Sequence, residues 1–259
     1  VACLRCCTAM VPLLLMARKH LGCKIDREDW KYFILVGCMG YFLTLFLIQL
    51  GISLTGSAMA SLLNALTPVS VTILAALLLK ERITPIKVLC LVLALAGTVV
   101  ITQGAGSQGE VLGIAVVLLS VVAWGFASVF MRRLTAKYPA VLVTTYGMAI
   151  SLLFHIPAGI FSAVTQPVNV SPKVVLTILY LGFFGSGFAQ FTWTKCLSLL
   201  PASTCSLFYP LQPAFSALLG AAILHETFTP AFFFGLLLIS ADVALSTWET
   251  QRLSEAAQK

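Results

Sequence analysis

Charged residues are scarce in this chain of 259 residues: Asp, Glu, Lys and Arg together make up only 10%, with 9 acidic side chains in all. Hydrophobic residues make up 59%, and the mean hydropathy is +1.01. Soluble domains carry about 25% charged residues on average, which solvate the surface. The lack of charge therefore excludes a soluble globular protein and indicates an integral membrane protein.

Motifs for ATP-driven or hydrolytic chemistry are also absent from the sequence. It contains no P-loop G-x-x-x-x-G-K-[ST], no H-E-x-x-H and no paired aspartates, and "GAGSQG" at 104–109 lies in a loop after an apolar run, where we interpret it as a turn. The eight cysteines lie mostly within apolar runs and do not form two C-x-x-C pairs, so we interpret them as small buried side chains. We expect no enzymatic activity, no metal and no cofactor.

Long uncharged runs define the predicted membrane spans. No charged residue occurs between Lys31 and Lys80, between Lys87 and Glu110, or between Lys137 and Lys173. A helix crosses the hydrocarbon core with about 20 apolar residues. The predicted spans are nine, with a break expected near "GISLTGS" at 51–57: 1–17, 32–50, 57–79, 86–103, 111–131, 139–161, 174–194, 203–224 and 230–248.

The spans are predicted to be helices because they lack the apolar and polar alternation of barrel strands. The fold class is therefore an all-α membrane protein. Because Val1 lies inside an apolar run that does not have the pattern of a signal peptide, we expect that N-terminal sequence is missing.

Basic residues predict the orientation of these spans. Alternate loops, together with the C-terminal segment, carry 14 of the 16 Lys and Arg residues, at 18–31, 80–87, 132–137, 195 and 252–259. Cytoplasmic loops are enriched in Lys and Arg, so these loops and the C-terminus are expected in the cytoplasm. This topology also explains the net charge of +7, so we expect no nucleic-acid partner.

The sequence repeats itself after 145 residues. Between 61 and 85, ten of 25 positions are identical to those 145 residues later, including the pairs Pro68 and Pro213, and Glu81 and Glu226. The same shift aligns Gly37 with Gly182 and Gly40 with Gly185. Five crossings separate equivalent positions, so the second copy is expected to be inverted, as in many secondary transporters.

The chain resembles the EamA-type members of the drug/metabolite transporter (DMT) superfamily over essentially its whole length. The residues that carry the resemblance are Arg5, "SAMASLLNALTPVSVTILAALLLKERIT" at 57–84, Trp124-Gly125, and "ASTCSLFYPLQPAFSALLGAAILHETFT" at 202–229. Asp242, in the last predicted span, stands where the family usually has a glycine at a contact between helices.

The resemblance implies a ten-helix bundle of two inverted five-helix repeats, of which nine spans are present here because the first helix is missing. The repeats are predicted at 1–103 and 111–248, with a cytoplasmic tail at 249–259. The resemblance also implies gradient-driven export of small polar metabolites, such as amino acids and related compounds, and a Trp124 that faces inward.

Polar residues inside the spans are candidates for the substrate pathway, because a polar group is costly in lipid unless it faces water or another polar group. Asn64 and Tyr209 are repeat mates one turn before the two prolines, and are the leading candidates. The full set of pathway candidates is Gln49, Asn64, Trp124, Gln190 and Tyr209.

Other residues suggest moving parts. Pro68 and Pro213 each free a backbone carbonyl and are predicted kinks or hinges, although a packing kink is the alternative. Glu81 and Glu226 lie at helix ends and are candidates for gates, or for interfacial carboxylates that pair with neighbouring residues.

His155 and Asp242 are titratable groups within spans, so they are candidates for proton coupling. A structural, hydrogen-bonded His155 and a hydrated Asp242 near the inner face are the alternatives.

These patterns predict a secondary-active exporter that works by alternating access in the plasma membrane. The expected partners are the lipid bilayer and a small-molecule substrate, and a homodimer is kept as an open alternative. A passive facilitator or channel, a scaffold and an intramembrane enzyme are the other hypotheses, the last of which lacks a motif.

Overall fold

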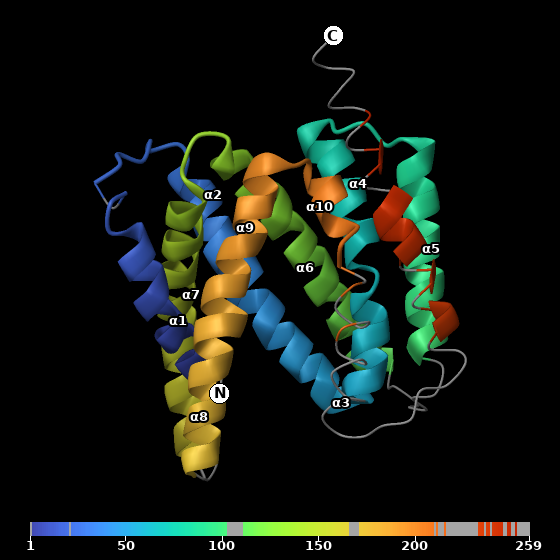
Figure 1. Cartoon of the computed structure of the whole chain (residues 1–259). Helices are drawn as coiled ribbons and strands as arrows, with labels where there is room; N and C mark the ends of the chain where they lie inside the picture. Colours follow the sequence, from blue (N-terminus) through green and yellow to red (C-terminus); the bar gives the residue numbers. More distant parts are fainter. Residues whose placement is uncertain are drawn as a thin grey trace. The chain divides into compact units, whose positions relative to one another are not determined.

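The protein is helical throughout the parts that the structure describes. The computed structural model describes residues 2–20, 22–102, 111–165, 171–209, 211, 215, 233–235, 237–238, 240–245, 248–249 and 252, and no strand occurs among them. Figure 1 labels the α-helices. The elements in chain order are α1 (Ala2–Ala17), α2 (Trp30–Leu35), η1 (Val36–Leu43), α3 (Thr44–Asn64), α4 (Thr67–Leu79), α5 (Pro85–Thr102), α6 (Val111–Thr135), α7 (Ala140–Thr165), α8 (Pro172–Tyr180), η2 (Leu181–Phe188), α9 (Ala189–Leu199) and α10 (Ala202–Ser206).

Four helical segments of the described residues are long and apolar enough to cross a membrane. They are Trp30–Gly56, Val111–Thr135, Ala140–Phe161 and Val174–Leu199, and shorter apolar helices occur at Ala2–Ala17, Thr67–Leu79 and Phe233–Leu245. The multi-pass, all-helical character predicted from composition is therefore confirmed. The count of nine spans stays a prediction.

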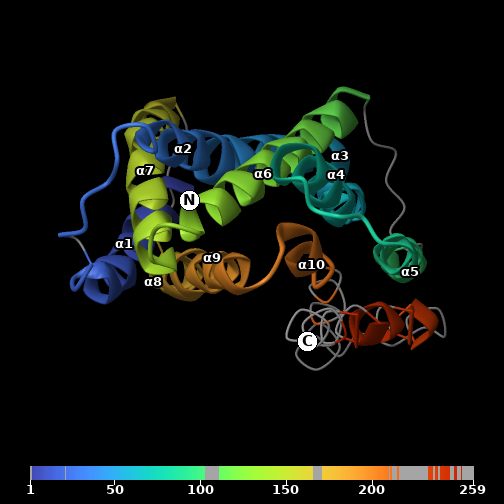
Figure 2. The ribbon, with the colours of Figure 1, turned by 90° about the horizontal axis from the view of Figure 1, so that it is seen from above.

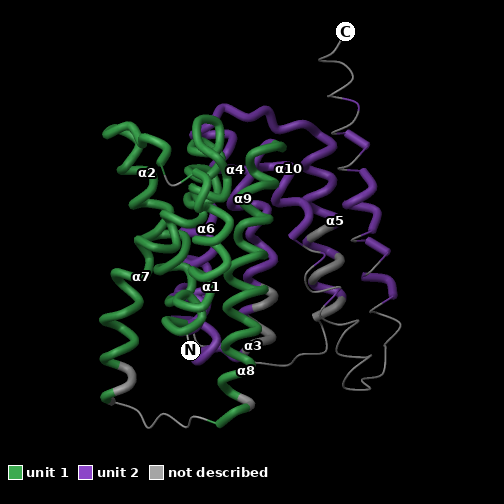
Figure 3. Tube along the Cα trace, turned by 60° about the vertical axis from the view of Figure 1, so that its left-hand side comes forward, with its two compact units in different colours: residues 1–46, 126–200 green, residues 47–125, 201–259 purple. Residues whose placement is uncertain are grey.

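The chain divides into two compact units, each assembled from two separate segments (Figure 3). Unit 1 consists of residues 1–46 and 126–200, and unit 2 of residues 47–125 and 201–259. Each unit takes residues from both predicted sequence repeats. The repeats are thus interleaved between the units.

In unit 1, helices of one predicted sequence repeat pack on helices of the other. Helix α1 of the first copy packs on η2 of the second copy, and α7 of the second copy packs on η1 of the first. Helices α1 and α7 also pack on each other, and α7 packs on α9; the view in Figure 2 shows this group end on. We call the α1 and η2 contact the first seam, and the α7 and η1 contact the second seam.

Both η1 and η2 are π-helices of eight residues, and they begin 145 residues apart, at Val36 and Leu181. The shift predicted from the sequence therefore aligns two instances of a rare backbone conformation, residue for residue. Single π-helical turns in longer helices widen the backbone and often occur at functional sites.

Glycines permit the close contacts of both seams. A Cβ atom on Gly37 would lie 2.7 Å from Cβ of Ile150, and one on Gly147 would lie 2.9 Å from Val36. In the first seam, a Cβ atom on Gly182 would collide with Thr8 and lie 2.9 Å from the Arg5 carbonyl oxygen. Side chains at these glycines would force the helices apart.

Unit 2 contains two breaks, and each differs in detail from the sequence prediction. The break expected near 51–57 is present, but it is confined to Gly56, whose φ of 82° and ψ of 161° interrupt α3. Glycine adopts positive φ without a Cβ penalty, so one residue makes the turn that a loop was expected to make.

The second break separates α3 from α4 at residues 65–66. Pro68 was expected in the middle of a kinked helix, but it lies in the first turn of α4. A proline is favourable there because its missing N–H has no intrahelical acceptor to lose. The helix is thus interrupted before Pro68. Its repeat mate Pro213 lies outside the described residues.

Candidate functional site

Asn64 lies at the end of α3, beside the interruption, and it is half-buried. The Thr67 hydroxyl is 2.6 Å from the Asn64 carbonyl oxygen, to which it donates, and 3.3 Å from Asn64 Oδ1. The side chain of Asn64 therefore keeps its amide N–H groups available. This is the arrangement that a polar contact to a solute requires.

Two of the predicted pathway residues meet in unit 2. The Trp124 side chain interacts with the hydroxyl of Tyr209, although 85 positions separate them. Trp124 is 7% exposed, and the neighbouring Gly125 packs against Ser70 and Leu74 of α4. The Ser70 hydroxyl donates to the Val121 carbonyl oxygen at 3.3 Å, which fixes α4 on α6. The close contact between α4 and α6 thus fixes the buried position of Trp124.

The two glutamines occupy different environments. Gln49 of α3 is exposed and belongs to unit 2. Gln190 of α9 belongs to unit 1, and its Oε1 atom is buried without a hydrogen-bond partner among the described residues. Neither is brought into contact with Trp124 and Tyr209 by a described interaction. An unsatisfied buried amide oxygen is costly, so Gln190 remains a pathway candidate.

Glu81 binds the beginning of α10. Its Oε1 atom accepts a hydrogen bond from the Ala202 N–H at 2.9 Å, and its Oε2 atom accepts from the N–H and hydroxyl of Ser203 at 3.1 and 2.6 Å. Buried Lys87 donates to the same hydroxyl at 2.8 Å. The carboxylate thus holds two segments of unit 2 that are about 120 residues apart, which the sequence did not predict. The mate Glu226 lies outside the described residues.

Asp242 is fully buried in unit 2, and Glu249 of the same unit is buried as well. The Cys90 thiol of α5 lies 3.6 Å from the Asp242 carbonyl oxygen, and no described residue other than Cys90 is placed to hydrogen-bond the carboxylate. Glu249 accepts a hydrogen bond from Thr84 at the start of α5. This buried position differs from the hydrated alternative considered for Asp242.

His155 of α7 is 4% exposed in unit 1. Its Nδ1 atom lies 3.0 Å from the Ser151 carbonyl oxygen, so Nδ1 carries the proton in the neutral ring. Its Nε2 atom is buried and has no partner among the described residues. The Nδ1 side of the ring thus makes a hydrogen bond within its own helix, whereas the Nε2 side makes none to a described residue.

The sequence prediction omitted a polar contact at membrane depth. Arg5 Nε donates to the hydroxyl of Ser186 at 2.9 Å, across 181 positions of the sequence. The sequence singled out Arg5 only as one of the residues that carry the family resemblance, and its partner could not be inferred. Ser186 lies in η2 and is 2% exposed.

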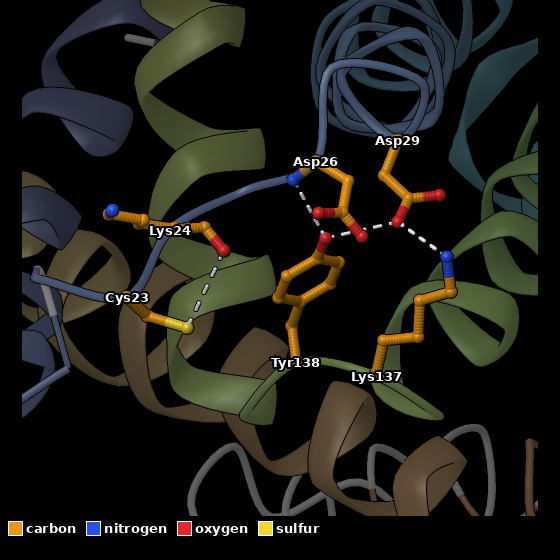
Figure 4. A network of polar contacts seen from close by, with 6 residues as sticks. All are labelled: Cys23, Lys24, Asp26, Asp29, Lys137 and Tyr138. Atoms are coloured by element: carbon orange, nitrogen blue, oxygen red, sulfur yellow. Dashed lines mark hydrogen bonds and ion pairs between the residues drawn. The ribbon is translucent and has the colours of Figure 1, made fainter.

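A second network that was not predicted lies outside the spans, in unit 1 (Figure 4). Lys137 and the Tyr138 hydroxyl donate to Asp29 Oδ2 at 2.8 and 3.0 Å, and the Asp26 N–H donates to the Tyr138 hydroxyl at 3.0 Å. The hydrogen bond from Lys137 is the main cause that lowers the pKa of Asp29, and the pKa of Tyr138 is raised mainly by burial. This network fixes the loop before α2 to the loop between α6 and α7.

A surface groove of about 430 Å³ runs between α1 and the helix formed by α8 and η2. Apart from Thr8, its lining is aliphatic or aromatic: Val11, Leu176, Leu179, Tyr180, Phe183 and Phe184. Such a surface suits hydrocarbon chains better than a polar solute. Within the described ranges, no group of three His, Cys, Asp or Glu side chains could hold a metal ion.

Comparison with known proteins gives a consistent result. The model of the EamA-like transporter family matches residues 1–103 and 111–248. An uncharacterized transporter of Archaeoglobus fulgidus is 31% identical over 212 residues, which is 81% of this chain and 74% of the relative. The uncharacterized transporter YoaV of Bacillus subtilis is 25% identical, covering 96% of this chain and 87% of the relative.

The fold is also found in a solved structure, described as "Crystal structure of protein". It superimposes with a TM-score of 0.81 at 23% identity and covers 95% of this chain and 87% of that chain. The family model spans nearly all the predicted membrane segments, and the named relatives are transporters. The chain therefore belongs to the EamA-like transporter family and is a multi-pass membrane protein.

Proposed function

We propose that the protein is a secondary-active transporter that exports small polar metabolites, such as amino acids and related compounds, across the plasma membrane. Alternating access between two inverted five-helix repeats moves the solute, and the C-terminus lies in the cytoplasm. Membership of the family supports transport as such. Substrate class, direction and mechanism are the content of the proposal.

The observation that carries the proposal is the reciprocal packing of the two copies in unit 1. A helix of each copy rests on the π-helix of the other, in a register set by the same shift of 145 residues. Inverted repeats of this kind give a transporter two related arrangements, one open to each side of the membrane.

The solute pathway is assigned to the polar and aromatic groups around the interruption in unit 2. Asn64 supplies amide donors next to that interruption, and Trp124 and Tyr209 form a contact with an aromatic face and a hydroxyl. Gln49 and Gln190 are further candidates. Interrupted helices expose backbone polar groups where they line a cavity.

Coupling and gating are assigned to buried carboxylates and to His155. Asp242 is enclosed, with only Cys90 beside its carboxylate among the described residues, so it is suited to bind and release a proton. Glu81 holds α10 through three hydrogen bonds and is the proposed gate on the face with basic loops. Glu226 is assigned the equivalent role at the opposite face.

Transport is tested with the protein in proteoliposomes loaded with a mixed pool of amino acids and other metabolites. Efflux is followed by mass spectrometry with and without an imposed pH gradient. We expect selective efflux that the gradient accelerates, and a loss of at least about tenfold in Asn64→Ala and Tyr209→Phe, each of which removes one polar group. Ser53→Ala is the matched control, because Ser53 is exposed and bonds only to Leu50 of its own helix.

Three outcomes separate the hypotheses. Flux that the gradient leaves unchanged indicates a passive facilitator. Gradient-driven flux that survives Asp242→Asn and His155→Phe removes the assigned coupling groups. The absence of any flux from correctly folded protein contradicts the transport proposal for this pool.

A further inference from the structure

Arg5 places a permanent positive charge within an apolar helix. It precedes the end of α1 at Ala17 by 12 residues, which corresponds to about 18 Å along the helix axis. Because 1–17 is a predicted span and the hydrocarbon core is about 30 Å thick, we expect Arg5 to lie within the core. Charged residues at such a depth are costly and usually mark a ligand or ion pathway.

Most N–H donors of the Arg5 guanidinium have no hydrogen-bond partner among the described residues. The guanidinium has five N–H donors, and Nε makes its single hydrogen bond to a described side chain, the Ser186 hydroxyl. Among the described ranges no carboxylate pairs with it, and the one ion pair found there joins Asp29 and Lys137. The remaining donors form a planar fork that matches a carboxylate.

Packing alone does not require this polar pair. The mates of Arg5 and Ser186 under the 145-residue shift are Ile150 and Tyr41. The second seam is also close, and Ile150 packs there against Gly37. The fold thus builds an equivalent seam without an arginine, so packing alone does not explain Arg5.

His155 lies on the neighbouring helix at the level of Arg5. Cys3 meets Gly159, and the Thr145 hydroxyl lies 3.4 Å from the Leu13 carbonyl oxygen, so α1 and α7 are antiparallel and this register brings His155 to the level of Arg5. Nε2 of the His155 ring is the buried acceptor without a partner among the described residues.

We propose that Arg5, Ser186 and His155 form a binding site for a small carboxylate that carries a hydroxyl or amino group on the adjacent carbon. The carboxylate binds the free donors of Arg5 beside Ser186, and the hydroxyl or amino group donates to Nε2 of His155. This site rests on the proposed transport function and narrows its substrate class, and it gives His155 a role in solute recognition in place of proton coupling.

The test is a binding experiment on the full chain in phosphatidylcholine nanodiscs, with four probes built on three carbons. Propionate has only the carboxylate, lactate adds a hydroxyl, alanine adds an ammonium group, and 1-amino-2-propanol lacks the carboxylate. Ligand-induced shifts in Tm and equilibrium binding of radiolabelled lactate and alanine are the readouts. We expect lactate and alanine to bind about tenfold more tightly than propionate, and 1-amino-2-propanol not to bind.

The variants assign each part of the site. Arg5→Gln is expected to abolish binding of all three carboxylates, and Arg5→Lys to retain it in weakened form. His155→Phe is expected to lower lactate affinity to that of propionate. Thr192→Val is the control, since Thr192 is exposed and bonds only to Phe188 of its own helix. If Arg5→Gln does not fold, Arg5→Lys and the probe series decide the outcome.

Several results would overturn the site. Binding of 1-amino-2-propanol as tight as that of lactate would exclude carboxylate recognition, and so would unchanged lactate binding in Arg5→Gln. A second set of nanodiscs contains phosphatidylglycerol; if this lipid stabilises the protein through Arg5 and the carboxylates do not, Arg5 binds a lipid headgroup. Binding without flux in proteoliposomes contradicts the transport function and leaves the site intact, whereas Asn64-dependent flux of solutes without a carboxylate does the reverse.

Discussion

The two seams of unit 1 have the same packing but different chemistry. Each joins a helix of one copy to a π-helix of the other through glycines. The first seam holds the hydrogen-bonded Arg5 and Ser186 at depth, while the equivalent positions of the second seam are Ile150 and Tyr41. The ion pair of unit 1, between Lys137 and Asp29, lies outside both seams, in the loops before α2 and α7.

This difference separates structural from functional requirements within one molecule. What both seams share, namely glycines and π-helical turns, is what the helix contacts need. Only the first seam contains a charged side chain within an apolar helix, that of Arg5. Such a charge reduces stability unless it is compensated. The asymmetric positions are therefore the first place to look for solute recognition.

Exchanging the mates at the two seams should give the largest effect. Ile150→Arg puts an unpaired charge and extra volume against Gly37, and we expect it to lower the free energy of unfolding by about 4 kcal/mol. Arg5→Ile should leave stability unchanged or higher, because it removes a charge from the core. Unfolding in a denaturing detergent titration measures both. A loss in Arg5→Ile comparable to that in Ile150→Arg would make Arg5 a structural residue.

Filling the glycines should damage the two seams alike. Gly182→Val and Gly37→Val each introduce atoms where Thr8 or Ile150 already packs, so we expect losses of about 2 to 3 kcal/mol in the same assay. Gly22→Ala is the control, since nothing lies within 4 Å of the added Cβ. A large effect at only one seam would contradict the shared packing.

The second glycine pair should behave asymmetrically. A Cβ atom on Gly40 would lie 2.7 Å from Cβ of Ala127, whereas one on its mate Gly185 would meet only Leu181 at 4.0 Å. We therefore expect Gly40→Ala to cost about 1.5 kcal/mol and Gly185→Ala less than about 0.5 kcal/mol. Thermal unfolding of the two variants side by side distinguishes them, and equal losses would count against the geometry described for η1.

The ion pair between Lys137 and Asp29 should give the smallest and most pH-dependent effect on stability. Asp29→Asn removes the charge that Lys137 and Tyr138 bind, and we expect a loss of about 1 kcal/mol at pH 7. Because the folded-state pKa of Asp29 is lowered, its contribution is complete above its unfolded pKa of about 4 and is lost as the pH falls through the folded value. Stability curves of both proteins should therefore begin to converge as the pH falls below about 4 and should meet below the folded-state pKa of Asp29; a constant difference would exclude the ionic origin.

Much of the fold follows from the sequence because its causes are local or periodic. Scarce charge predicts membrane helices, and aligned glycines such as Gly37 and Gly182 predict the duplication on which the seams rest. The position of the break near 51–57 was predicted, but its confinement to Gly56 could not be, since "GISLTGS" contains two glycines and two serines and suggests a loop equally well. The π-helical turns were not predicted either, because no composition rule distinguishes them from α-helix.

The candidate site is less predictable because its contacts join distant positions. Asn64 and Tyr209 could be selected as polar groups in apolar spans, and the contact of Tyr209 with Trp124 agrees with this selection. The binding of Glu81 to α10 and of Arg5 to Ser186 depends on tertiary packing over 121 to 181 positions. No local pattern carries that information.

The matched π-helices also bear on whether the wide turn or the internal duplication came first. A widened turn of this kind corresponds to one extra residue in a helix, and the same extra residue in both copies at the same position is most simply inherited from a single ancestral unit. On this inference the wide turn is older than the duplication, and the difference between Arg5 and Ile150 is younger.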